Sequence, residues 1–220
     1  MCRLGLRHED REGAVATRTG RLLVGLFLFA LGTVMTLRAD LGLSPWDVLH
    51  DGMRLRTPLT FGTATITIGV ALVVLGVLWG IKPGPGTLAN MVLIGVFVDL
   101  LLGTDLGAGV GDGSIALRAL LLIGGIVTIG LGSALYIGAE LGAGPRDGLM
   151  VLIATRTGWR VGVARALVEG SALVTGILLG GRAGVGTVVF ALGIGPAVDV
   201  WFRVFGMRSD GTRGPRVRPS

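Results

Sequence analysis

The feature that most constrains this chain is an internal duplication. Residues 40–99 align with residues 140–199 without a gap, and 20 of the 60 aligned positions are identical, against about 6 expected by chance from so biased a composition. The motif Leu41-Gly-Leu-Ser-Pro-Trp-Asp-Val-Leu49 returns as Leu141-Gly-Ala-Gly-Pro-Arg-Asp-Gly-Leu149. Glycines, a proline and aspartates are prominent among the matches, and such residues mark backbone geometry and polar sites. The chain is therefore predicted to contain two copies of one folding unit.

Composition places both copies in a lipid bilayer. The chain is 51% hydrophobic and only 15% charged, with a mean hydropathy of +0.76, which does not suit a soluble domain. A spanning helix needs about 20 apolar residues, and six stretches have that length: 21–38, 61–81, 87–103, 115–137, 161–180 and 186–205. These stretches predict an all-α membrane protein with six transmembrane helices.

Three spans in each copy predict two inverted repeats, because after an odd number of crossings the second copy enters the membrane from the opposite side. Residues 21–105 form the first predicted membrane repeat and residues 115–205 the second. Residues 1–20 are predicted to be a cytoplasmic tail and residues 206–220 a disordered cytoplasmic tail. Each repeat also has a short helix after its first span, over 45–56 and 145–156. A helix of about 18 Å cannot cross the bilayer, so it is predicted to be interfacial or re-entrant.

Basic residues predict the orientation. Fourteen of them fall on the side of the two termini and five on the other side, so the positive-inside rule predicts a bacterial cytoplasmic membrane protein with both termini in the cytoplasm. The same distribution, with arginines at the ends of apolar segments, makes nucleic acid a poor partner. The lipid bilayer is the expected partner, and whether the chain forms a homo-oligomer is open.

The two short helices are predicted to differ. One arc of the first helix is polar on a helical wheel, with Asp47, His50, Asp51 and Arg54. This arc predicts a half-wet helix on which His50 faces solvent and Trp46 anchors the interface. The second helix has Asp147 as its only acid and is predicted to be buried.

Glycine pairs recur at matching places in the second span of each copy. They are Gly76-x-x-x-Gly80 and Gly176-x-x-x-Gly180. Small residues four apart let helix backbones approach closely in lipid. Both pairs are therefore predicted to be helix packing contacts.

Seven polar residues form a candidate solute pathway: Ser44, Asp47, Asp99, Asp147, Arg165, Glu169 and Asp199. Carboxylates within membrane spans, such as Asp99 and Asp199, suggest a functional site. Each acid also has a structural alternative: Asp99 and Asp199 can cap or pair with a neighbouring helix end, and Asp47 and Asp147 can cap their own helices, with Ser44 as N-cap of the first. Arg165 and Glu169 have the spacing of an ion pair on one helix.

Several function classes lack their sequence signals. Cys2 is the only cysteine, and no Ser-His-Asp arrangement, zinc signature or nucleotide-binding fingerprint occurs. An enzyme is therefore not expected, and no catalytic residue, cofactor or metal ligand is predicted.

The duplicated motif resembles that of the YczE/YitT-type bacterial integral membrane proteins, and the resemblance covers about residues 20–205. It implies a multipass inner-membrane protein of a family without an established activity. We expect a permease or channel-like carrier of an unknown small solute. The alternative is a non-transporting scaffold or regulatory subunit of a partner complex. A polar cavity between the repeats would favour the carrier.

Overall fold

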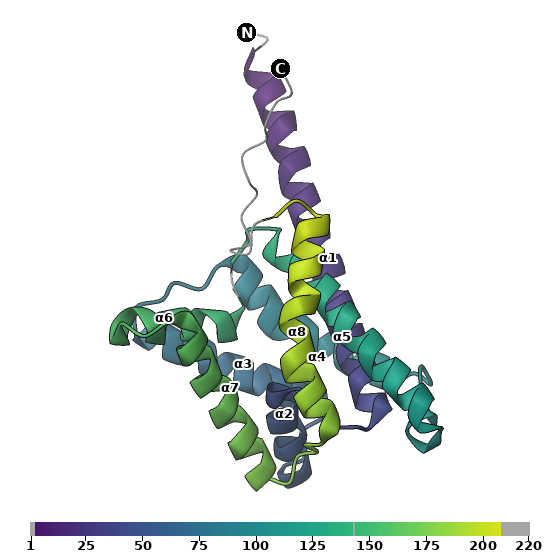
Figure 1. Ribbon diagram of the computed structural model, residues 1–220. Coiled ribbons are helices and arrows are strands. Elements are labelled where there is room, and N and C mark those ends of the chain that lie inside the picture. The colour runs from purple at the N-terminus through teal and green to yellow at the C-terminus, as the bar shows by residue number, and fades with distance from the viewer. Residues whose placement is uncertain (1–2, 143, 208–220) are drawn as a thin grey trace.

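The computed structural model describes residues 3–142 and 144–207, and within them the secondary structure is helical (Figure 1). Two helices are short, and a single 3-10 turn precedes the second half of the chain. The elements are α1 (Arg3–Ala39), α2 (Pro45–Arg56), α3 (Phe61–Leu78), α4 (Pro85–Leu102), η1 (Val110–Asp112), α5 (Ile115–Ile137), α6 (Pro145–Thr157), α7 (Val161–Leu178) and α8 (Val185–Val204).

Six of these helices are long and apolar enough to cross a membrane, namely α1 within Val15–Ala39, α3, α4, α5, α7 and α8. The six predicted spans are thereby confirmed, and the protein is a multipass membrane protein. The first span is longer than predicted, since α1 is helical from Arg3 and its apolar part begins near Val15. We call the side where α1 begins and α8 ends the terminal side (top of Figure 1), and the other the opposite side.

The two short helices lie at different levels of the bundle (Figure 1). α2 lies toward the opposite side, beside the lower part of α7, and α6 lies toward the terminal side above α7. Each follows a loop that opens with a residue in the left-handed region, Asp40 at φ 50° and Glu140 at φ 56°. Gly42 at φ 115° and Gly142 at φ 128° complete the same turn in each copy. Glycine adopts these φ values without the steric cost that a Cβ would add.

The centre of the bundle is the crossing of α1 and α5, whose backbones touch. A Cβ atom added at Gly25 would lie 2.8 Å from the carbonyl oxygen of Gly132, and one added at Gly32 would lie 2.6 Å from the carbonyl oxygen of Gly125. Small residues at a crossing let helices in lipid gain dispersion contacts. Large apolar residues of α1 fill the core on either side, among them Leu26, which is fully buried.

Each half of the chain also bonds to the loop of the other half. The N–H of Gly186 donates to the carbonyl of Leu41 at 2.7 Å, and the N–H of Gly86 donates to the carbonyl of Leu141 at 2.8 Å. The two donors, Gly86 and Gly186, are 100 positions apart in the sequence, and so are the two acceptors, Leu41 and Leu141, so the two contacts are equivalent. Each bond satisfies an N–H at the start of a helix, where it has no partner within the helix.

Of the Gly76/Gly80 and Gly176/Gly180 pairs, only Gly176 is the predicted packing contact: a Cβ there would lie 2.5 Å from the backbone nitrogen of Leu49 in α2. Gly80 and Gly180 have φ of +91° and +94° and lie just past the ends of α3 and α7. The N–H of Ile81 donates to the carbonyl of Gly76, and that of Gly181 to Gly176, both at 2.8 Å. This is the six-residue bond of a Schellman helix ending. Gly80 and Gly180 therefore end their helices and are not packing contacts.

Gly180→Ala should lower the thermal unfolding temperature in detergent, because alanine in the left-handed region costs about 1–2 kcal/mol. A Cβ at Gly180 has open space, with its nearest contact 4.0 Å away on Leu55, so backbone strain is the only expected effect. Gly170→Ala is the matched control, since a Cβ there also meets nothing within 4 Å but Gly170 lies inside α7. That change should leave the unfolding temperature equal or raise it. Equal behaviour of the two variants would contradict the assignment.

Candidate functional site

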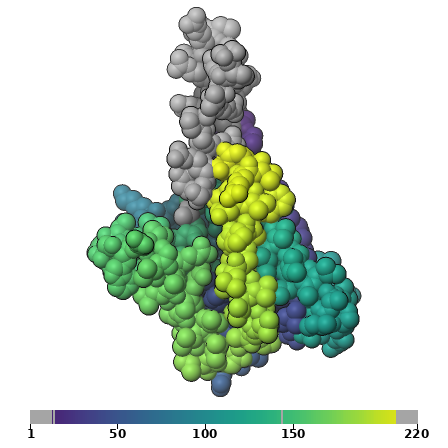
Figure 2. Space-filling view, viewed as in Figure 1, coloured from purple at the N-terminus to yellow at the C-terminus, as the bar shows by residue number. Residues whose placement is uncertain are grey.

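A cavity of about 770 Å³ lies between the two halves of the chain. It is lined by every described α-helix except α3, and by the loop around Glu140. Figure 2 shows a hollow between α7 (green) and α8 (yellow), with atoms of the early chain (purple) behind it. The polar lining residues are Ser44, Asp47, Asn90, Ser133, Tyr136, Glu140, Arg146, Asp147, Arg165, Glu169 and Asp199.

At the start of α2, Asp47 is held firmly. Ser44 Oγ accepts from the Asp47 N–H at 3.1 Å and donates to Asp47 Oδ2 at 2.6 Å. His50 Nδ1 lies 3.3 Å from Asp47 Oδ1. Burial alone would raise the pKa of Asp47, but the hydrogen bond and charge of His50, together with Arg146 and Ser44, hold it below its ordinary value. The predicted N-cap role of Ser44 is confirmed.

Three of the four residues on the polar arc of α2 are buried and only Arg54 is exposed, so the prediction of a half-wet first helix with His50 facing solvent was wrong. His50 is 1% exposed and Asp51 is 0% exposed. His50 contacts Asp47, Thr65 and the edge of the Phe61 ring. A helical wheel shows which residues share a face but not what packs against that face, and here α7 and α3 cover it.

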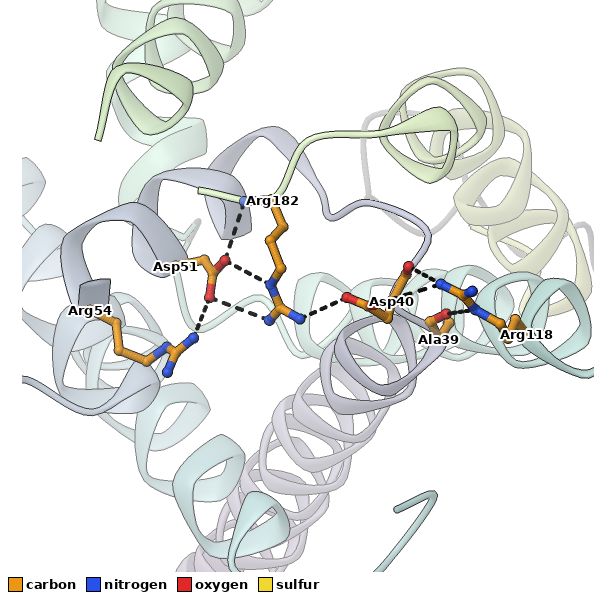
Figure 3. A network of polar contacts seen from close by, with 6 residues as sticks. All are labelled: Ala39, Asp40, Asp51, Arg54, Arg118 and Arg182. Carbon is orange, nitrogen blue, oxygen red and sulfur yellow. Dashed lines mark hydrogen bonds and ion pairs between the residues drawn. The ribbon is translucent and has the colours of Figure 1, made fainter. Parts of the chain in front are cut away.

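Asp51 organises a network on the opposite side that includes Asp40, Arg54, Arg118 and Arg182 (Figure 3). The Arg182 side chain, in the loop between α7 and α8, donates to Asp51 Oδ2 at 3.0 Å and to Asp40 Oδ1 at 2.8 Å. Arg54 donates to Asp51 Oδ1 at 2.9 Å, and Arg118 bonds to the carbonyl of Asp40. The network ties the loop after α7 to α2 and to the end of α1.

At the start of α6, Asp147 has a looser environment than Asp47. Gly144 stands where the first copy has Ser44, so no side chain caps the helix. Its one hydrogen bond within the described structure is a long one, from the Tyr136 hydroxyl to Oδ2 at 3.4 Å. Burial raises the pKa of Asp147 above its ordinary value, although Arg146 and Arg165 lie close enough to oppose the shift. Asp147 therefore presents a carboxylate to the cavity with little to hold it.

The second short helix is less buried than the first, which reverses the prediction. Only Pro145, Met150 and Ala154 are buried in α6, against seven residues in α2. α6 lies at the edge of the bundle in Figure 1, away from the α1–α5 crossing. Of the large apolar side chains of α6, Val151 is 51% exposed, whereas Met150 is buried.

Trp46 and Arg146 occupy equivalent positions and meet across the cavity. The Arg146 guanidinium lies 5.2 Å from the Trp46 ring centroid, within cation–π range. Trp46 is 6% exposed, and its indole nitrogen has no hydrogen-bond partner in the part of the chain described. The predicted interfacial anchor is thus a buried cavity residue.

Six of the seven predicted pathway residues share this cavity: Ser44, Asp47, Asp147, Arg165, Glu169 and Asp199. Arg165 and Glu169 form the predicted ion pair at 2.9 Å. Asp199 has no hydrogen bond or ion pair with any described residue.

Asp99 lies apart from the others. It lines a second pocket of about 730 Å³ on the opposite side and accepts from the N–H of Gly62 at 2.7 Å and from the Thr60 hydroxyl. The capping alternative weighed for Asp99 is therefore the role it has here.

Sequence reasoning missed five polar cavity residues: Asn90, Ser133, Tyr136, Glu140 and Arg146. Tyr136 is the only tyrosine of the chain, and a lone hydroxyl near the end of an apolar span was a usable signal. Asn90 could have been found as the one amide side chain within a span. Glu140 and Arg146 flank the repeated motif and gave no signal beyond their position.

A protein-family model described as a family of unknown function, DUF6198, matches residues 16–203. The uncharacterized membrane protein YczE of Bacillus subtilis is 39% identical over 170 residues, which cover 76% of this chain and 77% of that protein. An uncharacterized protein of Haemophilus influenzae is 34% identical over 183 residues, covering 83% of this chain and 82% of that protein. No solved structure gives a significant match. The predicted resemblance to YczE-type proteins is confirmed.

Proposed function

The chain belongs to this DUF6198 family, and from the cavity between its halves we propose that it is a carrier that moves a small solute bearing a cationic group across the bacterial cytoplasmic membrane. The observation that carries the proposal is the half-buried, weakly held carboxylate of Asp147 in a cavity of about 770 Å³. Cavities of that size suit a small organic molecule. An ionisable group in a membrane bundle is a sign of a substrate or ion pathway.

The charge balance of the cavity supports a cationic solute. Two guanidinium groups, of Arg146 and Arg165, line it, against the five carboxylates of Asp47, Glu140, Asp147, Glu169 and Asp199. Three of these acids have a partner: Asp47 has His50, Glu169 has Arg165, and Glu140 has Arg18 at 3.3 Å. Asp147 and Asp199 remain to attract a positive group, and the face of Trp46 offers a further contact for it.

An inverted-repeat arrangement is part of the proposal, and it places the cavity where such carriers bind solutes. A contact from a residue of the first half to one of the second half is matched by a contact in which the two halves exchange roles, as expected for two halves related by a twofold axis. Besides the two loop bonds and the glycine contacts of α1 and α5, Arg18 pairs with Glu140 and Arg118 pairs with Asp40. Corresponding residues in two such contacts are 100 positions apart in the sequence, as Arg18 and Arg118 are.

Both termini are proposed to be cytoplasmic. In a Cys2→Ser background, a cysteine at exposed Asp112 should react with an impermeant thiol reagent added to intact cells, and one at exposed Gly13, before the first span, should not. Both should react after the membrane is permeabilised, which controls for reactivity. Labelling of Gly13→Cys in intact cells would reverse the proposed orientation.

The proposed function predicts pH-dependent binding of cations. Choline, putrescine and lysine serve as probes in a thermal-shift assay on the purified protein, with acetate and glucose as controls. A cation that binds should raise the unfolding temperature. The rise should grow as pH increases through the raised pKa of Asp147, since only the ionised carboxylate attracts the cation. Asp147→Asn should remove the response, whereas Asp47→Asn should reduce it less, because Ser44 and His50 already occupy the Asp47 carboxylate.

Uptake of a binding probe into proteoliposomes then tests transport itself. Flux in wild-type vesicles but not in Asp147→Asn vesicles is the expected result. Binding without flux for every probe would favour the alternative, in which the protein is a scaffold or regulatory subunit and its cavity binds a ligand without moving it.

A further inference from the structure

In the first half of the chain, α3 and α4 are locked together by three residues that we call the first latch: Gly62, Gly95 and Asp99. The Asp99 carboxylate accepts from the N–H of Gly62 at 2.7 Å. A Cβ at Gly62 would overlap the carbonyl oxygen of Gly95, and a Cβ at Gly95 would lie 2.5 Å from the carbonyl oxygen of Gly62. The two helices are therefore in direct backbone contact, and glycine is required at both positions.

The second half has the same three residues at equivalent positions, Gly162, Gly195 and Asp199, which we call the second latch. Here they do not meet. A Cβ at Gly162 or at Gly195 would find nothing within 4 Å, and Asp199 has no hydrogen-bond or ion-pair partner among the described residues. α7 and α8 do not pack along one another as α3 and α4 do. The second latch is open.

The three latch residues are identical in the two halves, although Arg160 replaces Thr60, which also donates to Asp99, and Pro196 replaces Val96. Nothing near Gly162 or Gly195 requires a glycine in this conformation, and neither residue has a positive φ. Glycine inside a helix is destabilising. Asp199 is exposed and without a partner among the described residues, whereas Asp99 has two donors. A conformation in which the second latch closes would give all three residues the role that their counterparts have in the first latch.

The open latch borders the central cavity. Gly195 and Asp199 line it from α8, and Arg165 and Glu169 line it from α7. The cavity therefore reaches the gap between these two helices (Figure 2). On the other half, Ile94 of α4 lines the same cavity. Asp99 lines the pocket that opens to the opposite side. The closed first latch thus stands between the cavity and that pocket.

We propose that the protein exchanges between this conformation and a second one in which the Asp199 carboxylate accepts from the N–H of Gly162 and α7 packs on α8, while the first latch opens. The cavity is then covered between α7 and α8 and uncovered between α3 and α4. The α1–α5 crossing, with backbone contact at Gly25 and Gly32, is the part that stays fixed. This exchange supplies the alternating access that the proposed carrier needs, and it is measurable without any solute.

Spin labels at equivalent exposed positions can report both latches. In the full chain with Cys2→Ser, in lipid nanodiscs, one sample carries labels at Thr63 and Leu100 and the other at Val163 and Val200, all exposed. Pulsed electron paramagnetic resonance should find both a short and a long distance between the two labels of each pair. When more molecules show the short α7–α8 distance, more molecules should also show the long α3–α4 distance.

Two substitutions bias the exchange in opposite directions. Asp99→Ala removes the acceptor of the first latch, and it should enlarge the short α7–α8 fraction several-fold. Gly162→Leu fits the open space of the present conformation but prevents α7 from closing on α8. It should abolish the short α7–α8 distance and the long α3–α4 distance, and its location in open space means that it should fold even if Asp99→Ala does not.

The results separate this inference from the proposed function. A single unchanged distance for both pairs in the wild type and in every folded variant overturns the exchange, even if a probe crosses the membrane. Two exchanging distances that respond to the variants support it, even if no tested cation is carried, and in that case only the proposed function fails.

Discussion

Gly176→Leu should prevent the protein from folding, whereas Gly76→Leu at the equivalent position should be tolerated. A Cβ at Gly176 would lie 2.5 Å from the backbone nitrogen of Leu49 and 2.6 Å from the carbonyl carbon of Val48. These are backbone atoms of α2 and cannot rotate away. At Gly76 the nearest atom belongs to the flexible Ile81 side chain, at 3.6 Å.

Overpacking a tight contact typically costs about 1–3 kcal/mol, and a rigid backbone obstacle places Gly176→Leu at or above the upper end of that range. The amount of monodisperse protein extracted in detergent, and its thermal unfolding temperature, measure the difference. Equal yields for the two variants would show that α2 and α7 are not packed as described. The prediction separates two glycines that the sequence pattern treats as the same.

Asp51→Ala should be the second strongly destabilising change. Its carboxylate is completely buried and accepts from the side chains of Arg54 and Arg182 and from the backbone N–H of Arg182 at 3.2 Å. Breaking a fully buried pair costs about 3–5 kcal/mol. Because Arg54 and Arg182 are 40% and 44% exposed, water screens part of this loss, and we expect about 2–3 kcal/mol in the free energy of unfolding.

The pH dependence of stability tests the same network. Burial would raise the pKa of Asp51, but Arg182 and Arg54 outweigh it and hold the pKa below its ordinary value. The folded state therefore favours the ionised form more than the unfolded state does. This stabilisation is fully present above about pH 4 and is lost as pH falls through the lower, folded-state pKa. Asp51→Asn should flatten that acidic decline, and an unchanged acid profile would contradict the role given to Asp51.

The six spans and the two short helices could be predicted because they depend on local properties: apolar length, an N-cap at Ser44, and a proline in the first turn of each short helix. Burial could not be predicted in the same way. His50 and Asp51 have the sequence pattern of an exposed face, but His50 is covered by Thr65 and Phe61 of α3, and Asp51 by Arg182, more than 100 residues away.

The same distinction between local properties and long-range packing applies to the candidate site. The acids could be found because a carboxylate is unusual in an apolar segment. Which of them share a cavity depends on how the halves pack, and identical positions have different surroundings, as Asp99 and Asp199 show. The spacing of Gly76 and Gly80 was misinterpreted because a single glycine that ends a helix can stand four residues after another glycine and so match the packing pattern.

The exchanged bonds from Gly186 to Leu41 and from Gly86 to Leu141 have a consequence for how such a chain arose. A single half, expressed alone, would leave the carbonyl of its own loop and the N–H at the start of its last helix without these partners. An ancestral half-length protein would have satisfied them from a second copy inserted in the opposite direction. If the proposed inverted arrangement holds, the present chain is the fused descendant of a dual-topology dimer, in which each half still completes the other.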